Sequence, residues 1–447
     1  MIKVITYGTY DLFHYGHQRL LERAKALGDY LIVGVTADDF DKARGKINVE
    51  QSLMERIEAV KKTGLADEVI VEEYEGQKID DIQRYDIDIF AIGTDWEGKF
   101  DYLKEYCKVV YLDRTQGVSS TDLRAEKNLV RLGLVGKYDG IRKYATECAY
   151  VNGLNVEGAC VDDKILFRKE FPGVQFLTDD YDELLGRVDA VYIASHPSQH
   201  YMHIKRALLQ KKHVLCESPI VLDVVQYEEL TALAKEQGVI LMDAIKTAYS
   251  MAYNRLILLL KGGKIGRVVS VDATCTSLTD LQNSDYKDLG SKWNTICAWG
   301  PTAMLPVFQL LGPEYKCKTI TSSFIDEEQH FDIFTKIAFV YDHAVASIKI
   351  GKGVKSEGEL IISGTQGYVY VPAPWWKTDF FEIRYEDSNH NKRYFYQLDG
   401  EGIRYELVQF VKAIESGRPS FYIQAATSKA IVQIVENFYH HVDMITI

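Results

Sequence analysis

Short apolar runs alternate with amphipathic segments twice along this chain, and this alternation restricts the folds open to it. Between residues 2 and 113, runs such as IKVITY and YLIVGVT are separated by segments with helical spacing, such as HQRLLERAKALG. A second cycle starts at LVRLGLVG (129–136) and continues to VILMDA (239–244). Parallel strands need a crossover connection, usually a helix. The alternation therefore predicts two doubly wound parallel sheets, each with ligand contacts at the carboxyl ends of its strands.

From about residue 265 the pattern changes. Runs such as RVVSVDATCT, AVASIKIG and GELIISGT follow one another, and a helical segment, TSKAIVQIVENFYHHV, comes near the end of the chain. They predict a mostly antiparallel sheet closed by a C-terminal helix. A chain of 447 residues is too long for one ordinary core. The predicted fold class is α/β, with a Rossmann-like domain over 1–127, a second Rossmann domain over 128–245 and an α+β domain over 246–447.

Composition excludes several classes of function. The net charge of −12 argues against a nucleic-acid-binding surface, which needs clustered Lys and Arg. The seven cysteines are odd in number and contain no C-x-x-C pair, which disfavours a disulfide framework or a zinc site. No signal peptide is recognisable, and no apolar run reaches the roughly 18–20 residues of a membrane span. We therefore expect a cytoplasmic protein with neither a nucleic-acid partner nor a membrane span.

The segment GTYDLFHYGHQRLL (8–21) places His14 and His17 at the start of the first predicted helix, with Gly16 between them. A helix N-terminus attracts anions through its N–H groups and dipole. Glycine lets a phosphate approach the backbone, and imidazoles donate hydrogen bonds to phosphoryl oxygens. The segment alone fits a phosphate site and a histidine-rich turn equally well.

A second helix start of the same kind follows the last strand of this domain, in RTQGVSSTDLR (114–124). Arg114 can pair with a phosphate, and the hydroxyls of Thr115, Ser119 and Ser120 can donate to phosphate or simply cap the helix. Two such helix starts at strand ends of one sheet favour a phosphate site over capping alone.

Residues 1–125 resemble the glycerol-3-phosphate cytidylyltransferases, within the nucleotidyltransferase superfamily that carries H-x-G-H. The resemblance rests on YGTYDLFHYGH, GDYLIVGV, RGK, IGTDWEGKFDYL and RTQGVSST. It implies transfer of CMP from CTP to a polyol phosphate, either glycerol 3-phosphate or a longer alditol phosphate, with release of pyrophosphate and a requirement for Mg²⁺. An in-line attack of this kind needs positioning and charge neutralisation more than a base.

The resemblance also implies roles for individual residues. His14, His17, Lys46 and Arg114 become the catalytic set that binds the triphosphate and reaches the transferring phosphoryl group. Asp11 becomes the candidate residue that holds Mg²⁺ or positions the phosphates. The implied CTP-binding residues are Thr9, Tyr10, Asp11, Gly16, Arg56, Asp95, Trp96, Thr115, Ser119 and Ser120.

Residues 128–447 resemble the Gfo/Idh/MocA oxidoreductases, through YDELL, DAVYIASHPSQHYMHIKRALLQKKHVLCESPI and GGKIGRVVSVDAT. The resemblance implies an NAD(P)H-binding Rossmann domain followed by a sheet domain for a sugar or polyol. Cofactor residues carried over are Gly136, at the first glycine position, and Glu217, in the family's E-K-P motif. Asp162, at the end of the second strand, is either a partner for a ribose 2′-hydroxyl, favouring NAD, or a solvated strand-end acid.

Three family signatures are altered in this region. Tyr138 stands where the second glycine of G-x-G-x-x-G is expected, and Ser218 replaces the E-K-P lysine. Ala298 and Thr302 stand where the family has Asp and His. If the chemistry has relocated, Lys246 is the best candidate for catalytic proton transfer, with Tyr249 close by. Otherwise Lys246 is a surface lysine.

Two interpretations follow. In the first, the chain is a bifunctional enzyme that makes a CDP-activated polyol for a surface polymer such as capsule or teichoic acid, and the oxidoreductase module supplies the polyol phosphate by NAD(P)H-dependent reduction. In the second, it is a cytidylyltransferase with a redox-inactive, structural or dimerising domain. We expect a homo-oligomer in either case.

Overall fold

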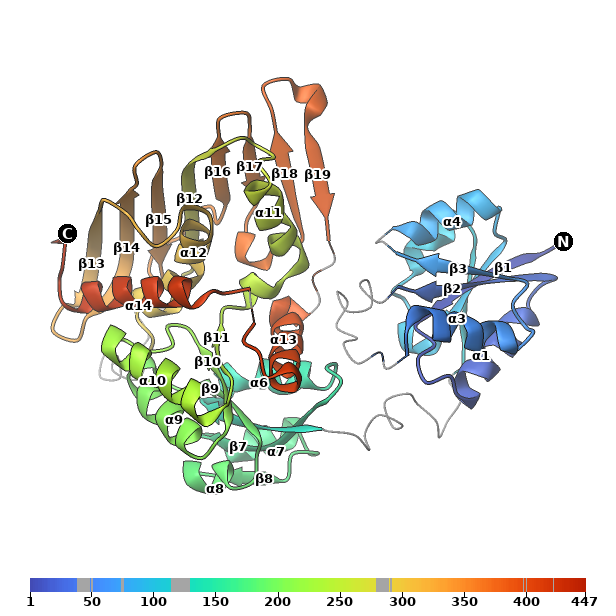
Figure 1. Cartoon of the computed structure of the whole chain (residues 1–447), viewed down its shortest axis with the longest axis horizontal. Coiled ribbons are helices and arrows are strands. Elements are labelled where there is room, and N and C mark those ends of the chain that lie inside the picture. The colour runs from blue at the N-terminus through green and yellow to red at the C-terminus, as the bar shows by residue number, and fades with distance from the viewer. Residues whose placement is uncertain are drawn as a thin grey trace. The chain divides into compact units, whose positions relative to one another are not determined.

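The computed structural model describes residues 1–37, 49, 51–73, 76–113, 129–278, 289, 292–396, 398, 400–420 and 422–447. The chain forms two compact units (Figure 1). The first comprises Met1–Leu129 with Val151–Gly153, and the second comprises Val130–Tyr150 with Leu154–Ile447. None of the helices in the described ranges is both long enough and apolar enough to span a membrane.

The first unit is built on a parallel sheet with the strand order β3-β2-β1-β4-β5. β1 is buried on both faces: Val4 packs in a core with helices α1 and α3, whereas Ile5 and Tyr7 pack in a core on the α4 side. Burial of both faces explains the continuous apolar runs in the sequence. The elements are β1 (Lys3–Gly8), α1 (Tyr15–Lys25), β2 (Tyr30–Thr36), α3 (Leu53–Lys62), β3 (Glu68–Glu72), α4 (Gln77–Tyr85), β4 (Ile89–Gly93), η1 (Thr94–Trp96), η2 (Asp101–Glu105) and β5 (Lys108–Leu112).

The second unit begins with another parallel sheet, in the order β11-β10-β9-β6-β7-β8. The chain runs outward from β6 to β8 and then returns to β9 on the other side of β6, so the strand order reverses between β6 and β9. Ligands of such sheets bind at this reversal, beyond the carboxyl ends of the strands. The elements are β6 (Val130–Gly136), α6 (Tyr138–Cys148), β7 (Leu154–Val161), α7 (Lys164–Glu170), β8 (Phe176–Thr178), α8 (Tyr181–Leu185), β9 (Ala190–Ala194), α9 (Pro197–Leu209), β10 (His213–Glu217), α10 (Val224–Gln237) and β11 (Leu241–Ala244).

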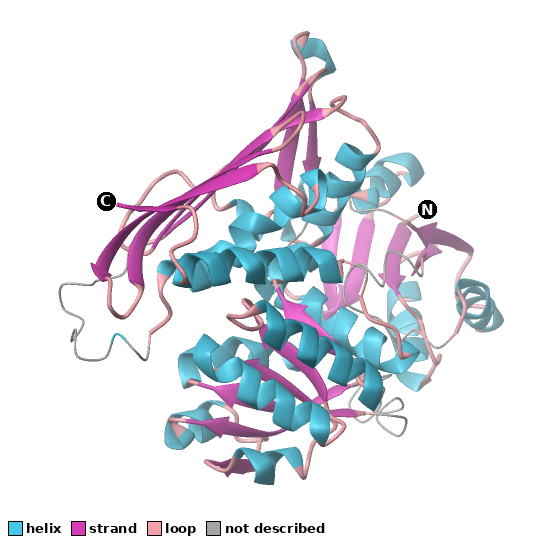
Figure 2. Cartoon of the chain, turned by 60° about the vertical axis from the view of Figure 1, so that its left-hand side comes forward, coloured by secondary structure: helices cyan, strands magenta, loops and turns pink. Residues whose placement is uncertain are grey.

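The remainder of the second unit forms a mixed sheet in the order β19-β18-β17-β16-β12-β15-β14-β13-β20, with helices along one face (Figure 2). Among its described strands only the pairs β12–β15 and β13–β20 are parallel, which confirms the mostly antiparallel sheet. The elements are η3 (Lys246–Tyr249), α11 (Met251–Lys261), β12 (Val268–Thr276), α12 (Thr295–Leu311), β13 (Cys317–Asp326), β14 (Phe331–Val340), β15 (Val345–Gly351), β16 (Leu360–Gly364), β17 (Tyr368–Val371), η5 (Trp375–Lys377), β18 (Phe380–Arg384), η6 (Ser388–His390), β19 (Lys392–Phe395), η7 (Gly400–Gly402), α13 (Ile403–Ser416), α14 (Ala425–Tyr439) and β20 (Met444–Thr446).

Candidate active sites

The turn after β1 fixes the two histidines of the first unit in a reciprocal cap of α1. His14 is the N-cap residue, and its Nδ1 accepts a hydrogen bond from the Gly16 amide at 3.0 Å. His17 Nδ1 accepts from the His14 amide at 3.4 Å, and the two rings stack with centroids 4.0 Å apart. Because each Nδ1 is an acceptor, the proton of each neutral ring sits on Nε2. The pair therefore presents two Nε2–H donors at a helix N-terminus, where an anion is favoured.

Asp11 ties this turn to the start of α3. Its side chain is buried, and its Oδ1 accepts a hydrogen bond from the Gln51 amide at 3.0 Å. Gln51 returns the contact, since its Oε1 accepts from the Leu12 amide at 2.8 Å. The Tyr10 and Phe13 rings each lie with centroids 5.5 Å from the His17 ring. The structure thus gives Asp11 a tethering contact, whereas its role toward Mg²⁺ stays a prediction.

Arg56 is completely buried beneath the same turn. Its Nη1 donates to the carbonyl oxygens of Thr9 at 2.7 Å and Thr36 at 2.8 Å, and its Nε donates to that of Gln51 at 3.2 Å. One guanidinium therefore joins the carboxyl ends of β1 and β2 to the start of α3. These contacts make Arg56 a positioning residue for the turn that carries the histidines.

A buried polar network at the ends of β2 and β3 was not predicted from the sequence. Glu72 accepts a hydrogen bond from Thr36 Oγ1 at 3.0 Å and pairs with Lys78, and all three side chains are buried. Lys78 also lies 4.7 Å from the centroid of the Tyr7 ring, whose hydroxyl donates to Asp81 at 2.8 Å. Burial and the Asp81 carboxylate raise the pKa of Tyr7. The sequence signal was the acidic residue that ends the apolar run EVIVE.

Asp95 and Trp96 follow β4 at the same edge of the sheet. Asp95 is exposed, whereas the Trp96 ring is half-buried, with its centroid 5.8 Å from that of Phe100. Lys99 Nζ lies 5.1 Å from the Trp96 ring centroid. Nine predicted site residues therefore lie after β1 or β4, in α1, or on α3 beneath the turn that follows β1: Thr9, Tyr10, Asp11, His14, Gly16, His17, Arg56, Asp95 and Trp96.

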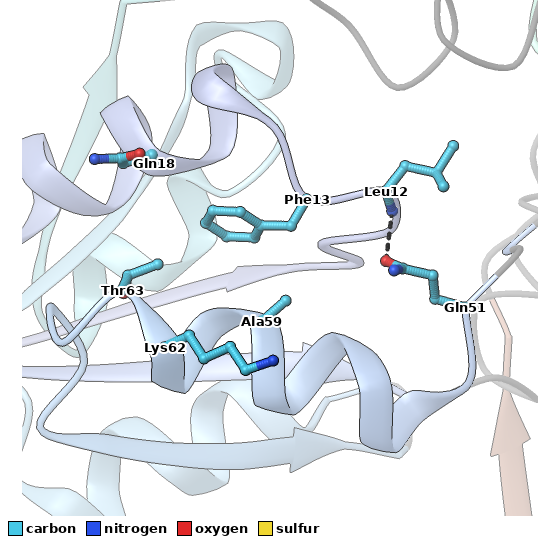
Figure 3. A pocket seen from close by; sticks show the side chains of 7 residues that line it. All are labelled: Leu12, Phe13, Gln18, Gln51, Ala59, Lys62 and Thr63. Atoms are coloured by element: carbon cyan, nitrogen blue, oxygen red, sulfur yellow. Dashed lines mark hydrogen bonds between the residues drawn. The ribbon is translucent and has the colours of Figure 1, made fainter.

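Five other predicted residues of this site lie outside the described residues: Lys46, Arg114, Thr115, Ser119 and Ser120. A hollow of about 760 Å³ lies between α1 and α3, and Phe13 points into it (Figure 3). Neither histidine is among the described residues that line this hollow, so it does not coincide with the predicted CTP site. It is lined by Leu12, Phe13, Gln18, Gln51, Ala59, Lys62 and Thr63.

In the second unit, Gly136 ends β6 at the point where the strand order reverses. Its φ is 148°, and a Cβ at this position would lie 2.7 Å from the Ala194 carbonyl oxygen, so the close approach of β6 to β9 requires glycine. Tyr138 begins α6, and its amide donates to Asp162 Oδ1 at 2.8 Å. The Tyr138 hydroxyl donates to Glu170 on α7. The tyrosine side chain is thus directed toward α7.

A hollow of about 430 Å³ opens at the ends of β6, β7 and β9. Asp162, Ser195 and His196 line it, and Tyr138 is not among its described lining residues. Burial lowers the pKa of His196, which favours the neutral ring. A hollow at the strand-order reversal, next to a helix N-terminus and a strand-end carboxylate, fits a dinucleotide.

Buried acids and tyrosines surround the position of the altered E-K-P motif. Glu217 Oε1 accepts hydrogen bonds from Tyr192 at 2.6 Å and Tyr144 at 3.3 Å, and the two tyrosine rings stack with centroids 3.6 Å apart. Tyr144 also donates to Glu406 of α13 at 2.6 Å. Burial raises the pKa of Glu217, and burial together with the Glu217 charge raises that of Glu406 well above its usual value. Glu406 carried no sequence signal.

Lys246 follows β11 next to this cluster. Its side chain is 30% exposed, and its Nζ lies 3.4 Å from Glu401 Oε2. Its positive charge favours the ionised form of Glu217. Tyr249 is buried, and its hydroxyl donates to the Asp243 carbonyl oxygen at 3.0 Å. Tyr249 therefore makes a packing contact inside the unit. Ser218, in the lysine position, is buried.

Comparison with known proteins assigns families to both parts of the chain. Residues 5–126 match the cytidylyltransferase-like family, and residues 142–244 match the oxidoreductase family with an NAD-binding Rossmann fold. The glycerol-3-phosphate cytidylyltransferase of Bacillus spizizenii is 56% identical over 126 residues, which cover 28% of this chain and 97% of that protein. That of Staphylococcus aureus is 48% identical over 129 residues, covering 28% of this chain and 95% of that protein.

The second unit has relatives among sugar oxidoreductases. A dTDP-3,4-didehydro-2,6-dideoxy-alpha-D-glucose 3-reductase of Actinomadura kijaniata is 32% identical over 158 residues, covering 34% of this chain and 47% of that protein. A solved 3-ketoreductase from Actinomadura kijaniata, in complex with NADP and TDP-benzene, superposes with a TM-score of 0.61 at 20% identity, covering 72% of this chain and 100% of that chain. UDP-N-acetylglucosamine 3-dehydrogenase from Acidithiobacillus ferrooxidans superposes with a TM-score of 0.56 at 16% identity, covering 70% and 98%.

The two structural likenesses support the fold of the second unit, and the cytidylyltransferase match spans almost the whole of each Bacillus and Staphylococcus relative. This chain therefore belongs to the family of the glycerol-3-phosphate cytidylyltransferases through its first unit, and it is an enzyme in which that domain is joined to a Gfo/Idh/MocA oxidoreductase domain.

Proposed function

We propose that the first unit transfers CMP from CTP to a polyol phosphate, either glycerol 3-phosphate or a longer alditol phosphate. The observation that carries the proposal is the reciprocal cap of α1. Because Nδ1 of His14 and of His17 accepts a backbone amide in this cap, Nε2 of each ring is the hydrogen-bond donor. A phosphate oxygen of the acceptor attacks the α-phosphorus of CTP. The bond from that phosphorus to the bridging oxygen breaks, and pyrophosphate leaves. Preorganised N–H donors stabilise the charge that develops on the phosphoryl oxygens.

Mg²⁺ fits this site as a companion of the triphosphate. Among the described residues there is no group of three His, Cys, Asp or Glu side chains able to hold a metal ion. Asp11 is buried and already accepts a hydrogen bond from the Gln51 amide. Mg²⁺ is commonly bound through substrate phosphates and one or two carboxylates. Asp11 is the residue that would contribute such a carboxylate.

The test of this activity is pyrophosphate release by the full chain with glycerol 3-phosphate and either CTP or ATP. We expect strong preference for CTP and loss of activity in EDTA that added Mg²⁺ restores. Longer alditol phosphates tested in parallel identify the preferred acceptor. Equal rates with ATP, or full activity in EDTA, would contradict the proposal.

For the second unit we propose NAD(P)H-dependent reduction of a keto or aldehyde precursor to the polyol phosphate. When bound, the dinucleotide supplies a hydride to the carbonyl carbon. Gly136 and Asp162 would hold it at the reversal of strand order, with Glu217 toward the reacting end. The alkoxide that results needs a proton, and Lys246 is the candidate donor because it lies beside Glu217 at the carboxyl edge of the sheet.

A second candidate function for this unit is purely structural, as a redox-inactive or dimerising domain. The observation that favours it is the loss of the family's catalytic side chains at Ser218, Ala298 and Thr302. In contrast, the hollow at β6, β7 and β9 and the direction of Tyr138 favour a retained dinucleotide site. We therefore place the reductase first.

The two candidates differ in NADH or NADPH oxidation when dihydroxyacetone phosphate and longer keto phosphates are offered. We expect turnover by the wild type, and loss of turnover with retained CMP transfer in Lys246→Ala. Lys429→Ala, which removes an exposed lysine paired with Glu228, is the matched control and should behave as wild type. Oxidation at the wild-type rate by Lys246→Ala would remove Lys246 from the mechanism.

A further inference from the structure

Three lysines from separate elements of the second unit converge on one carboxylate, that of Glu401. Lys377 Nζ lies 2.7 Å from Glu401 Oε1, Lys143 Nζ lies 2.9 Å from Oε2, and Lys246 Nζ lies 3.4 Å from Oε2. The lysines belong to η5, α6 and η3, respectively. All four side chains remain between 30% and 51% exposed, so the cluster can be reached from solvent.

The backbone holds Glu401 in this position at an energetic cost. Glu401 has a φ of 54°, in the left-handed region that residues with a Cβ disfavour. Gly400 before it has a φ of 55°, and a Cβ there would overlap Glu147. Such strain persists where the surroundings require it. The ion pairs with the three lysines are contacts that can stabilise this conformation.

One carboxylate cannot neutralise three ammonium groups. Burial alone would raise the pKa of Glu401, but the hydrogen bonds from Lys377 and Lys143 and the charge of Lys246 outweigh burial and lower that pKa to about 2. Lys246 also faces Glu217 and Glu406, and burial raises the pKa of both acids, most strongly that of Glu406. Among the described residues, three ammonium groups thus contact one ionised carboxylate, and such a group of cations suits a phosphate dianion.

The cluster lies next to the proposed reducing centre. Lys246 directly follows β11, and the Thr247 hydroxyl donates to the Trp376 carbonyl oxygen at 2.9 Å, which ties the lysine segment to η5 and Lys377. The Trp376 ring in turn packs on Trp299 of α12, with centroids 4.9 Å apart. If Lys143 and Lys377 bind an anionic group of the substrate, the remaining part of that substrate would lie beside Lys246.

We propose that Lys143 and Lys377, with Lys246 alongside, form a phosphate subsite of the oxidoreductase domain. In the free protein the Glu401 carboxylate pairs with these lysines. When substrate binds, its phosphoryl group replaces the Glu401 carboxylate as their partner. The proposal rests on the proposed reductase function and defines its substrate class as a carbonyl compound that carries a phosphoryl group. That group belongs either to a simple keto phosphate or to a nucleotide-linked compound, and the chemistry of the subsite is shared by both.

The test compares the full-length wild type with Lys143→Ala/Lys377→Ala. Calorimetric titration with glycerol 3-phosphate, without divalent ions, counts the equivalents bound, and glycerol is the uncharged control. We expect the double variant to bind one equivalent fewer than wild type while keeping CMP transfer. Lys316→Ala/Lys429→Ala removes two exposed lysines paired with Asp342 and Glu228, and this matched control should keep every equivalent.

Kinetics and a second ligand assign the source of the phosphate. In NADH oxidation, the double variant should raise KM for dihydroxyacetone phosphate at least about 10-fold, with little change for dihydroxyacetone. CDP-glycerol is titrated in the same way. If the wild type binds one equivalent of CDP-glycerol that the double variant does not bind, and if this equivalent displaces glycerol 3-phosphate, the subsite belongs to a nucleotide-linked substrate.

Two further outcomes separate this proposal from the reductase function. Loss of the equivalent in a protein that oxidises no NADH would support the subsite and contradict the reductase. Unchanged stoichiometry and unchanged KM in the double variant would overturn the subsite.

Discussion

In His14 and in His17, Nδ1 accepts a hydrogen bond from a backbone amide. The local fold therefore determines that Nε2 carries the proton of each neutral ring. In most helix caps a hydroxyl or carboxylate makes these contacts. Here imidazoles make them, and the helix start gains two N–H donors in addition to its own amides. The cap of α1 therefore also places hydrogen-bond donors where an anion is favoured.

His17→Ala should lower CMP transfer by about 10²–10³-fold, because one preorganised donor to the developing phosphoryl charge is lost. The rate of pyrophosphate release with CTP and glycerol 3-phosphate measures the effect. Gln18→Ala, at the next and exposed position of α1, should retain the wild-type rate. Turnover by His17→Ala close to that of Gln18→Ala would remove the histidine from the catalytic set.

Asp162 should make the second unit prefer NADH over NADPH, because its carboxylate at the end of β7 accepts a ribose hydroxyl but repels a 2′-phosphate. Asp162→Ser should reduce the ratio of the two dissociation constants at least about 10-fold. Asp163→Ser is a control with the same change of charge, since Asp163 accepts from the Leu166 amide as the cap of α7 and serine can replace it there. An unchanged ratio in Asp162→Ser would exclude this role.

Residue identity and spacing predicted the histidine pair, Gly136 and Asp162, because each belongs to a short motif around one strand end. The partners of Arg56 could not be predicted in this way, since they are carbonyl oxygens contributed by three separate segments. The replacement of a glycine by Tyr138 is visible in the sequence, but the direction of its side chain toward Glu170 is not. Glu406, which shares Tyr144 with Glu217, lies 189 positions later in the chain.

At the scale of elements, the parallel strands were predictable because burial on both faces leaves a continuous apolar run. α13 was not predicted from the sequence. Its buried face packs on α6 and η3, which lie far from it in the sequence. β20 has only three residues and is defined by its pairing with β13. Short elements of this kind owe their conformation to tertiary contacts.

Arg56 joins three elements of the first unit, so Arg56→Lys should destabilise that unit by at least about 2 kcal/mol. Lysine keeps the charge but cannot reproduce a planar fork that donates to separate carbonyl groups. The loss of unfolding free energy is measured by denaturant titration, with amide hydrogen exchange in β1 and β2 as the probe. Arg84→Lys, at an exposed position of α4, should change stability little. Equal stability of the two variants would contradict the linking role of Arg56.

Asp332 links β14 to the start of α12, and it should make the stability of the second unit depend on pH. Its Oδ1 accepts from the Ile296 amide at 3.1 Å, and burial raises its pKa from 3.8 to about 6. The folded state therefore holds the proton more tightly than the unfolded state, and the resulting stabilisation, present below about pH 4, is lost as pH rises to about 6.

Asp332→Asn keeps the shape of the protonated acid without its charge. Between pH 4 and pH 7, wild type should lose up to about 3 kcal/mol of unfolding free energy relative to Asp332→Asn. This amount corresponds to the rise of the Asp332 pKa from 3.8 to about 6. Unfolding titrations at several pH values measure it. A difference that stays constant over this range would show that Asp332 titrates normally.

At the scale of the whole molecule, the chain joins a domain of one enzyme family to a domain of another. The cytidylyltransferase part carries, after β1, the residues that its resemblance to that family assigns to the site, and the structure gathers His14 and His17 at the start of α1. The oxidoreductase part lacks the family's lysine and histidine but keeps a hollow at the strand-order reversal and gathers three lysines around Glu401. We propose that both parts are active and that the second supplies the phosphorylated polyol that the first consumes.

Calorimetric titration of the full chain with NADH and NADPH, on a preparation whose CMP transfer from CTP has been measured, distinguishes an active second part from an inactive one. We expect one equivalent of dinucleotide to bind per chain, with NADH bound more tightly than NADPH. Absence of heat with either dinucleotide, in protein that transfers CMP at full rate, would contradict the reductase and leave a cytidylyltransferase with a structural second domain.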